Sequence, residues 1–133
     1  MEIKCVQIIV IYQNEILVLE EKTMNTNKIS LPIGIIEPGE SNLQSAIRNC
    51  YEETGVIITQ RDFIKKLKTY VIQKNDICTT INPLVFRLLD KQKPEIMDDR
   101  VSRIYYMRIS QFKEKFKNNK ECNLIEESIK YLG

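Results

Sequence analysis

The chain has 133 residues, of which 43% are hydrophobic and 29% are charged, and its formal net charge is only +2. This composition is typical of an ordinary globular protein, and the length predicts one domain over 1–133. So small a net charge gives no reason to expect a nucleic-acid or membrane partner. The sequence contains no histidine, which excludes histidine-based triads, zinc sites and general bases.

The four cysteines, at positions 5, 50, 78 and 122, lie far apart and form no C-x-x-C pair. They fit neither a zinc cluster nor a small secreted disulfide framework, so each is interpreted as a mostly buried apolar side chain. Charged residues interrupt the apolar N-terminal run, and no signal-peptide cleavage region follows it. The sequence therefore predicts a cytoplasmic protein without a membrane-spanning helix.

The first elements in chain order are β-strands. Runs rich in Ile, Val and Leu over 3–12 and 15–20 predict a β-hairpin, and a polar loop is expected over 22–28. Two prolines and two glycines lie among apolar residues in 29–40. They predict a strand fragment and a structured turn in place of a helix.

A helix over 42–54 is predicted with well-defined ends. Ser41 and Gln44 form an S-x-x-Q capping box, and Gly55 is placed just past the helix end. At about 100° per residue the helix is amphipathic. The side expected to face the core carries Leu43, Ala46, Ile47, Cys50, Tyr51 and Thr54. The opposite side carries Asn42, Ser45, Arg48, Asn49, Glu52 and Glu53.

A strand or a strand-like exit is predicted over 56–60. Strands are predicted over 63–73, 77–90 and 103–109, the second of these with a bend at Pro83. A short helix over 110–119 and a longer one over 121–133 complete the chain. This succession of strands and helices predicts an α+β protein, an α/β/α sandwich with a mixed β-sheet.

Asn49, Glu52 and Glu53 are three and four positions apart, so their side chains converge on one face of the helix. Both acids lie in the last turn, where the helix dipole disfavours each by about 0.3–1 kcal/mol. A bound hard cation such as Mg²⁺ or Mn²⁺ explains the pair, and such an ion commonly also binds a substrate phosphate. A solvated pair of glutamates is the alternative.

The spacing from residue 34 to residue 56 follows G-x5-E-x7-R-x-x-x-E-E-x-G-apolar. The matching positions are Gly34, Glu40, Arg48, Glu52, Glu53, Gly55 and Val56. This pattern resembles the Nudix box, and the elements on either side resemble the rest of the Nudix fold. The resemblance implies Mg²⁺- or Mn²⁺-dependent hydrolysis of a nucleoside diphosphate linked to another group.

Site residues carry over from this resemblance by position. Glu52 and Glu53 would bind the metal, and Arg48 would hold the acidic cluster by ion pairing. Glu40 would support the loop and reach towards the metal, and the carbonyl of Ile33 would lie beside it. Asn49 would be the remaining residue of the site, with its amide oxygen directed at the metal.

Three positions depart from the family pattern. Asn49 replaces a glutamate, and an amide can offer a carbonyl oxygen to a metal but cannot accept a proton from water. Ile33-Gly34 stands where the family often has Gly-Gly. A later acid that many members supply has Asp98 and Asp99 as its candidates, with an ordinary solvated turn as the alternative role.

Two other functions stay open beside the hydrolase. One is a Nudix-fold module that binds a nucleotide without hydrolysing it, and the other is a protein-interaction role. An exposed sheet edge could also pair two copies in a homodimer. The identity of the group linked to the diphosphate cannot be predicted, because specificity in such folds lies in loops outside the box.

Overall fold

The computed structural model describes residues 1–117 and 119–132. Residues 118 and 133, which fall within the predicted helices 110–119 and 121–133, lie outside the described residues. The strands are β1 Glu2–Tyr12, β2 Glu15–Lys22, β3 Asn27–Ser30, β4 Ile33–Ile35, β5 Phe63–Lys66, β6 Tyr70–Lys74, β7 Ile77–Arg87 and β8 Val101–Arg108. The helices are α1 Asn42–Thr54, the short 3-10 helix η1 Gln60–Asp62, α2 Ile109–Lys115 and α3 Lys120–Ile129.

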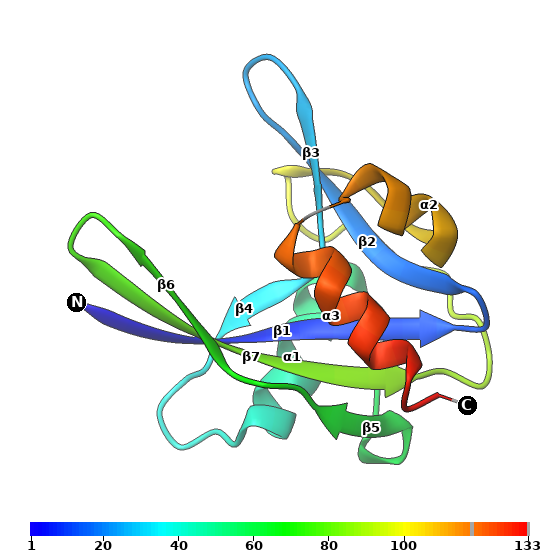
Figure 1. The fold of residues 1–133 in the computed structure, drawn as a ribbon, viewed down its shortest axis with the longest axis horizontal. Helices are drawn as coiled ribbons and strands as arrows, with labels where there is room; N and C mark the ends of the chain where they lie inside the picture. Colours follow the sequence, from blue (N-terminus) through cyan, green and yellow to red (C-terminus); the bar gives the residue numbers. More distant parts are fainter. Residues whose placement is uncertain (118, 133) are drawn as a thin grey trace.

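The strands form one mixed sheet with helices on both faces (Figure 1). Its main path is β3-β2-β1-β7-β5, while β8 pairs with β2, β6 with β7 and β4 with β1. Strands β1 and β7 are parallel, and the other pairs are antiparallel. The predicted α+β fold, an α/β/α sandwich around a mixed sheet, is confirmed.

Strands β1 and β2 pair only beside their connecting turn, where Ile11 lies opposite Ile16. Further back along β1, the partner is β4, with Cys5 opposite Ile35. The sheet therefore opens into two arms, one of β2, β3 and β8 and the other of β1, β4 and β7. The last turn of α1 lies at this opening, where Glu53 comes near Glu21 of β2.

Two apolar clusters fill the space between the sheet and its helices. Alternate β1 side chains, such as Ile8 and Ile9, point to opposite faces and belong to different clusters. Helix α1 covers the first through Ala46 and Cys50. Helices α2 and α3 cover the second, with α3 in front of the sheet in Figure 1. Full burial of a large apolar side chain in either cluster contributes about 1.5–3 kcal/mol.

The predicted ends of the 42–54 helix are confirmed. Both hydrogen bonds of the Ser41–Gln44 capping box form, and Gly55 takes a left-handed φ of 74° just past the helix. The two predicted helix sides need correction at three positions, one of which is Ser45, predicted on the polar side but fully buried. Tyr51 is 48% exposed, whereas Asn49, predicted on the polar side, is only 7% exposed because it packs against β4.

The strand predicted over 56–60 is wrong. This segment is extended, but its backbone partner is a side chain: the amide of Gln92 donates to the Ile57 carbonyl at 2.6 Å and accepts from the Ile57 N–H at 2.8 Å. The strand predicted over 63–73 is divided into β5 and β6. Both pair with β7, and the interruption lies beside Pro83, whose carbonyl accepts from the Leu67 N–H.

Among the described residues, no helix is both long enough and apolar enough to cross a membrane.

Candidate active site

Arg48 is the centre of an ion-pair network on the exposed side of α1. Its guanidinium donates to both oxygens of Glu40, at 2.7 and 2.9 Å, and to Glu52 at 3.0 Å. It also donates to the carbonyl of Ile35 at 3.1 Å. A bidentate pair of this kind is shorter and stronger than a neutral hydrogen bond. The network joins β4, the following loop and the end of α1 into one unit.

Glu40 is held as a carboxylate inside this loop. The hydrogen bonds from Arg48 are the main cause that lowers its pKa to about 2. Glu40 also accepts a hydrogen bond from the Glu37 N–H at 2.9 Å, which contributes to the same shift. Glu40 therefore stays ionised at every physiological pH. The carboxylate closes the loop between β4 and α1 at the same time as it orients Arg48.

Asn49 lies in a buried slot between α1 and β4. Its amide nitrogen donates to the Ser45 carbonyl at 2.9 Å, to the Ser45 hydroxyl at 3.0 Å and to the Ile35 carbonyl at 3.2 Å. Its oxygen lies against Gly34, where an added Cβ would come within 2.0 Å of it. Gly34 is thus required for close approach, and the Asn49 amide joins the helix to the strand.

The backbone of β4 turns two carbonyls away from β1. Pro32 accepts from the Ile8 N–H and Lys4 accepts from the Ile36 N–H, so the alternation of an antiparallel ladder directs the carbonyls of Ile33 and Ile35 to the other side. The Ile35 carbonyl already accepts hydrogen bonds from Arg48 and Asn49. The Ile33 carbonyl therefore points away from β1 as well.

Glu53 has the least favourable surroundings of the carboxylates in the site. One of its oxygens is inaccessible to solvent and has no hydrogen-bond partner among the described residues. Its pKa is raised to about 8, chiefly by burial and also by the nearby acids Glu21, Asp98 and Glu52, against a smaller opposing effect of Arg100. An unpartnered buried carboxylate among other acids is costly unless a proton or a cation compensates it.

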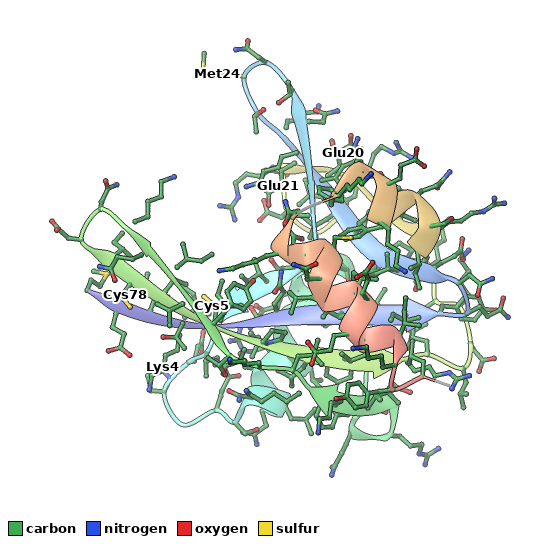
Figure 2. All side chains as sticks on the ribbon, in the orientation of Figure 1. Lys4, Cys5, Glu20, Glu21, Met24 and Cys78 are labelled. Carbon is green, nitrogen blue, oxygen red and sulfur yellow. The ribbon has the colours of Figure 1, made fainter. Side chains whose placement is uncertain are left out.

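Two residues near Glu53 were not predicted from the sequence. Glu21 comes from the end of β2, beside the base of the β2–β3 hairpin (Figure 2). Arg100 binds Asp98 at 2.7 Å and precedes β8, which pairs with β2 at Val101. Strand alternation could have placed Glu21 on the α1 side of the hairpin. Its nearness to Glu53 depends on the opening between the arms of the sheet.

Asp98 and Asp99, the two candidates for a later acid, differ in their interactions with the site. Asp98 is among the acids that raise the pKa of Glu53, while its own pKa is lowered to about 2, chiefly by the hydrogen bond from Arg100. No such interaction is found for Asp99 within the described residues. The structure therefore favours Asp98 over Asp99 as the acid nearest the candidate site.

The donor set fits a divalent cation that is only partly coordinated by protein. The unpartnered oxygen of Glu53 and the neighbouring carboxylate of Glu52 are suitable hard ligands. Yet no three His, Cys, Asp or Glu side chains in residues 1–117 and 119–132 are arranged to hold a metal by themselves. Mg²⁺ commonly keeps several waters and binds through one or two carboxylates and a substrate phosphate.

Glu53 predicts an unusual pH dependence in metal-free buffer. Because its pKa is higher in the folded chain than the ordinary value of 4.5, the folded state binds the proton more strongly. The stability that Glu53 contributes is therefore fully present below pH 4.5 and is lost as the pH rises through about 8. We expect a loss of about 2 kcal/mol between pH 5 and pH 9, discounted for partial exposure.

Urea unfolding of the wild type and of Glu53→Gln across this pH range measures the effect. The glutamine variant should lose most of the slope, whereas Glu114→Gln, which changes an exposed glutamate of α2, should keep it. The same slope in all three proteins would contradict the assignment.

Comparisons with known proteins identify the family. The family model described as the NUDIX domain matches residues 3–126. The chain therefore belongs to the Nudix family. A comparison with curated proteins found no significant match.

Several solved structures share the fold at low sequence identity. A NUDIX hydrolase from Nitrosomonas europaea aligns with a TM-score of 0.74 at 20% identity, over 98% of this chain and 87% of that chain. A C. elegans Ap4A hydrolase aligns at 0.72 and 15% identity, over 96% and 95%. A bifunctional NMN adenylyltransferase/ADP ribose pyrophosphatase from Francisella tularensis, complexed with AMP and Mn, aligns at 0.63 and 20% identity, over 86% and 36%.

Proposed function

We propose that the chain is a Mg²⁺- or Mn²⁺-dependent hydrolase that cleaves the diphosphate of a nucleoside diphosphate linked to another group. The observation that carries this proposal is the buried, unpartnered oxygen of Glu53 within a group of acids at the opening of the sheet. Helix α1 is a rigid support for this group, because both of its ends are capped and one face is buried.

Each site residue has a role in the proposed reaction. Glu52 and Glu53 would hold the metal, with the Ile33 carbonyl beside it. A bound divalent ion would neutralise phosphate oxygens and lower the pKa of the attacking water. Arg48 and Glu40 would position these ligands by holding the loop against α1.

Asn49 is proposed mainly as a positioning residue. Its nitrogen already donates to three acceptors, so only its oxygen is left for a metal, and that oxygen lies against Gly34. A general base must come from elsewhere, because an amide cannot take the proton of water. Apart from Glu52, which would hold the metal, Glu21 and Asp98 are the acids close enough to Glu53 to raise its pKa, and they are the candidates.

The same amide favours a second candidate function, a module that binds nucleotides without hydrolysing them. Such a module needs the braced loop and the cation but no base. Either function needs only a small-molecule nucleotide as partner, and we place both in the cytoplasm, where the four free cysteines would stay reduced. The free edge of β6 could pair two copies in a homodimer.

A substrate panel separates the two functions. Two structural neighbours are named as an Ap4A hydrolase and an ADP ribose pyrophosphatase. Diadenosine tetraphosphate, ADP-ribose and the nucleoside triphosphates therefore form a suitable panel, each with Mg²⁺, Mn²⁺ or chelator. We expect metal-dependent product formation from at least one compound. A ligand-induced rise in melting temperature without any product would instead support the binding module.

A further inference from the structure

Residues 88–100, all of them described, connect β7 to β8 without a helix or a strand. Connections of this kind are commonly more mobile than the elements that they join. This one is fastened near its start, where the Leu88 N–H donates to the Ile11 carbonyl at 2.9 Å and the Leu88 side chain is buried. Lys91 then binds Glu15 of β2 at 2.8 Å. The first part of the connection is therefore held against the sheet.

Gln92 joins the connection to the segment that follows α1. Its side-chain amide pairs with both backbone groups of Ile57, donating to the carbonyl at 2.6 Å and accepting from the N–H at 2.8 Å. The backbone carbonyl of Gln92 accepts from the Tyr106 hydroxyl at 2.7 Å. Gln92 is thus held from two sides, by the segment after α1 and by β8.

Three residues further on, the connection reaches the end of α1. The Glu95 N–H donates to the carbonyl of Thr54, the residue next to Glu53, at 2.8 Å. An added Cβ on Gly55 would come within 3.1 Å of the Glu95 nitrogen. The glycine therefore does more than end the helix, because a side chain at this position would crowd the passing backbone.

The far end of the connection is fastened to β2. The Lys22 N–H donates to the Arg100 carbonyl at 3.2 Å, and Lys22 follows Glu21 in the same strand. Residues 96–99 therefore run from the end of α1 to the end of β2. They cross the opening of the sheet, where the acidic site lies.

Asp98 lies within this span and is one of the acids near Glu53. The side chains of Ile96 and Met97 are half exposed, so their burial contributes little to holding the span in place. The position of Asp98 depends on the contacts at either side. On the α1 side one contact joins backbone groups of Glu95 and Thr54, and the contact made by a side chain is that of Gln92.

We propose that Gln92 is a positioning residue, which holds the connection 88–100 against the end of α1 so that Asp98 stays beside Glu53. Gln92 acts through the course of the backbone and does not itself belong to the acidic site. The inference rests on the proposed hydrolysis, in which Asp98 is a candidate for the general base. A displacement of about 1 Å in such a group lowers the rate of the chemical step.

Steady-state kinetics with Gln92→Ala test the proposal. This variant loses both hydrogen bonds to Ile57, and kcat should fall at least about tenfold while KM stays within about threefold. Gln92→Glu keeps the acceptor but not the donor, so it should show a smaller change in the same direction. Gln111→Ala, which changes an exposed glutamine of α2, should match the wild type.

A double variant shows whether Gln92 acts through Asp98. If it does, Gln92→Ala/Asp98→Asn should be no slower than Asp98→Asn alone, because the group that Gln92 positions is already disabled. Hydrogen exchange gives a readout that needs no turnover. The Glu95 N–H should exchange faster in Gln92→Ala, while the Cys50 N–H inside α1 keeps its protection and shows that the fold is intact.

The outcomes distinguish this inference from the proposed function. A wild type without turnover would remove the proposed hydrolysis, and the inference with it. In an active wild type, unchanged exchange at Glu95 or an unchanged kcat in Gln92→Ala would overturn the inference alone. Losses that multiply in the double variant would also overturn it, since Gln92 would then act by a route other than Asp98.

Discussion

Asn49→Glu is expected to destabilise the metal-free protein by about 3 kcal/mol, because a buried donor is replaced by a charged acceptor. The wild-type amide donates to Ser45 and to the Ile35 carbonyl, and a carboxylate would repel the same oxygens. The side chain is also one methylene longer in a slot that already touches Gly34. Urea unfolding in the presence of chelator measures the loss.

Asn49→Asp separates charge from size in this test. Its side chain has the shape of asparagine but lacks the donors, so it should show a large part of the same loss. An Asn49→Glu protein as stable as the wild type would mean that the amide is not a structural contact. The position would then be free to serve the metal, as the glutamate of the family pattern does.

Arg48→Met is expected to lower turnover about a hundredfold or more, because a displacement of about 1 Å in a positioned group can cost that much. The methionine keeps much of the apolar stem but removes the contacts to Glu40, Glu52 and the Ile35 carbonyl. The pKa of Glu40, now about 2, should rise towards its ordinary value. Steady-state kinetics and a carboxylate titration by NMR measure the two effects.

Arg48→Lys is the matched control for charge. Lysine keeps the charge but cannot form the bidentate pair with Glu40, so it should recover little of the rate. Hydrogen exchange at Glu37 and Glu40 should accelerate in both variants, since their loop loses its brace. Full activity in Arg48→Met would show that the network does not position the site.

The parts of the fold that depend on neighbouring residues could be predicted from the sequence. The capping box of Ser41 and Gln44 and the end of α1 at Gly55 are local contacts, and each occurs where the sequence placed it. The β1–β2 hairpin is local in the same sense. The segment 56–60 looked like a strand by composition, but its partner is the side chain of Gln92, 35 residues away along the chain.

The acidic site could be predicted only in part for the same reason. The spacing of Arg48, Glu52 and Glu53 fixes one face of a helix, and the structure places them together. Helical periodicity alone put Asn49 on the solvent side, because it does not show that the short strand β4 packs against this part of α1. Glu21 comes near Glu53 only because β1 and β2 diverge, which is a property of the whole sheet.

The most direct test is the initial rate of product formation from the best compound of the panel, for wild type and Glu53→Gln, with and without Mg²⁺. The wild type should form product only with the metal. Glu53→Gln should stay folded and lose about a hundredfold or more in rate, because it loses the carboxylate proposed to hold the metal. Glu114→Gln should match the wild type. Metal-independent turnover, or an unchanged rate in Glu53→Gln, would contradict the proposed site.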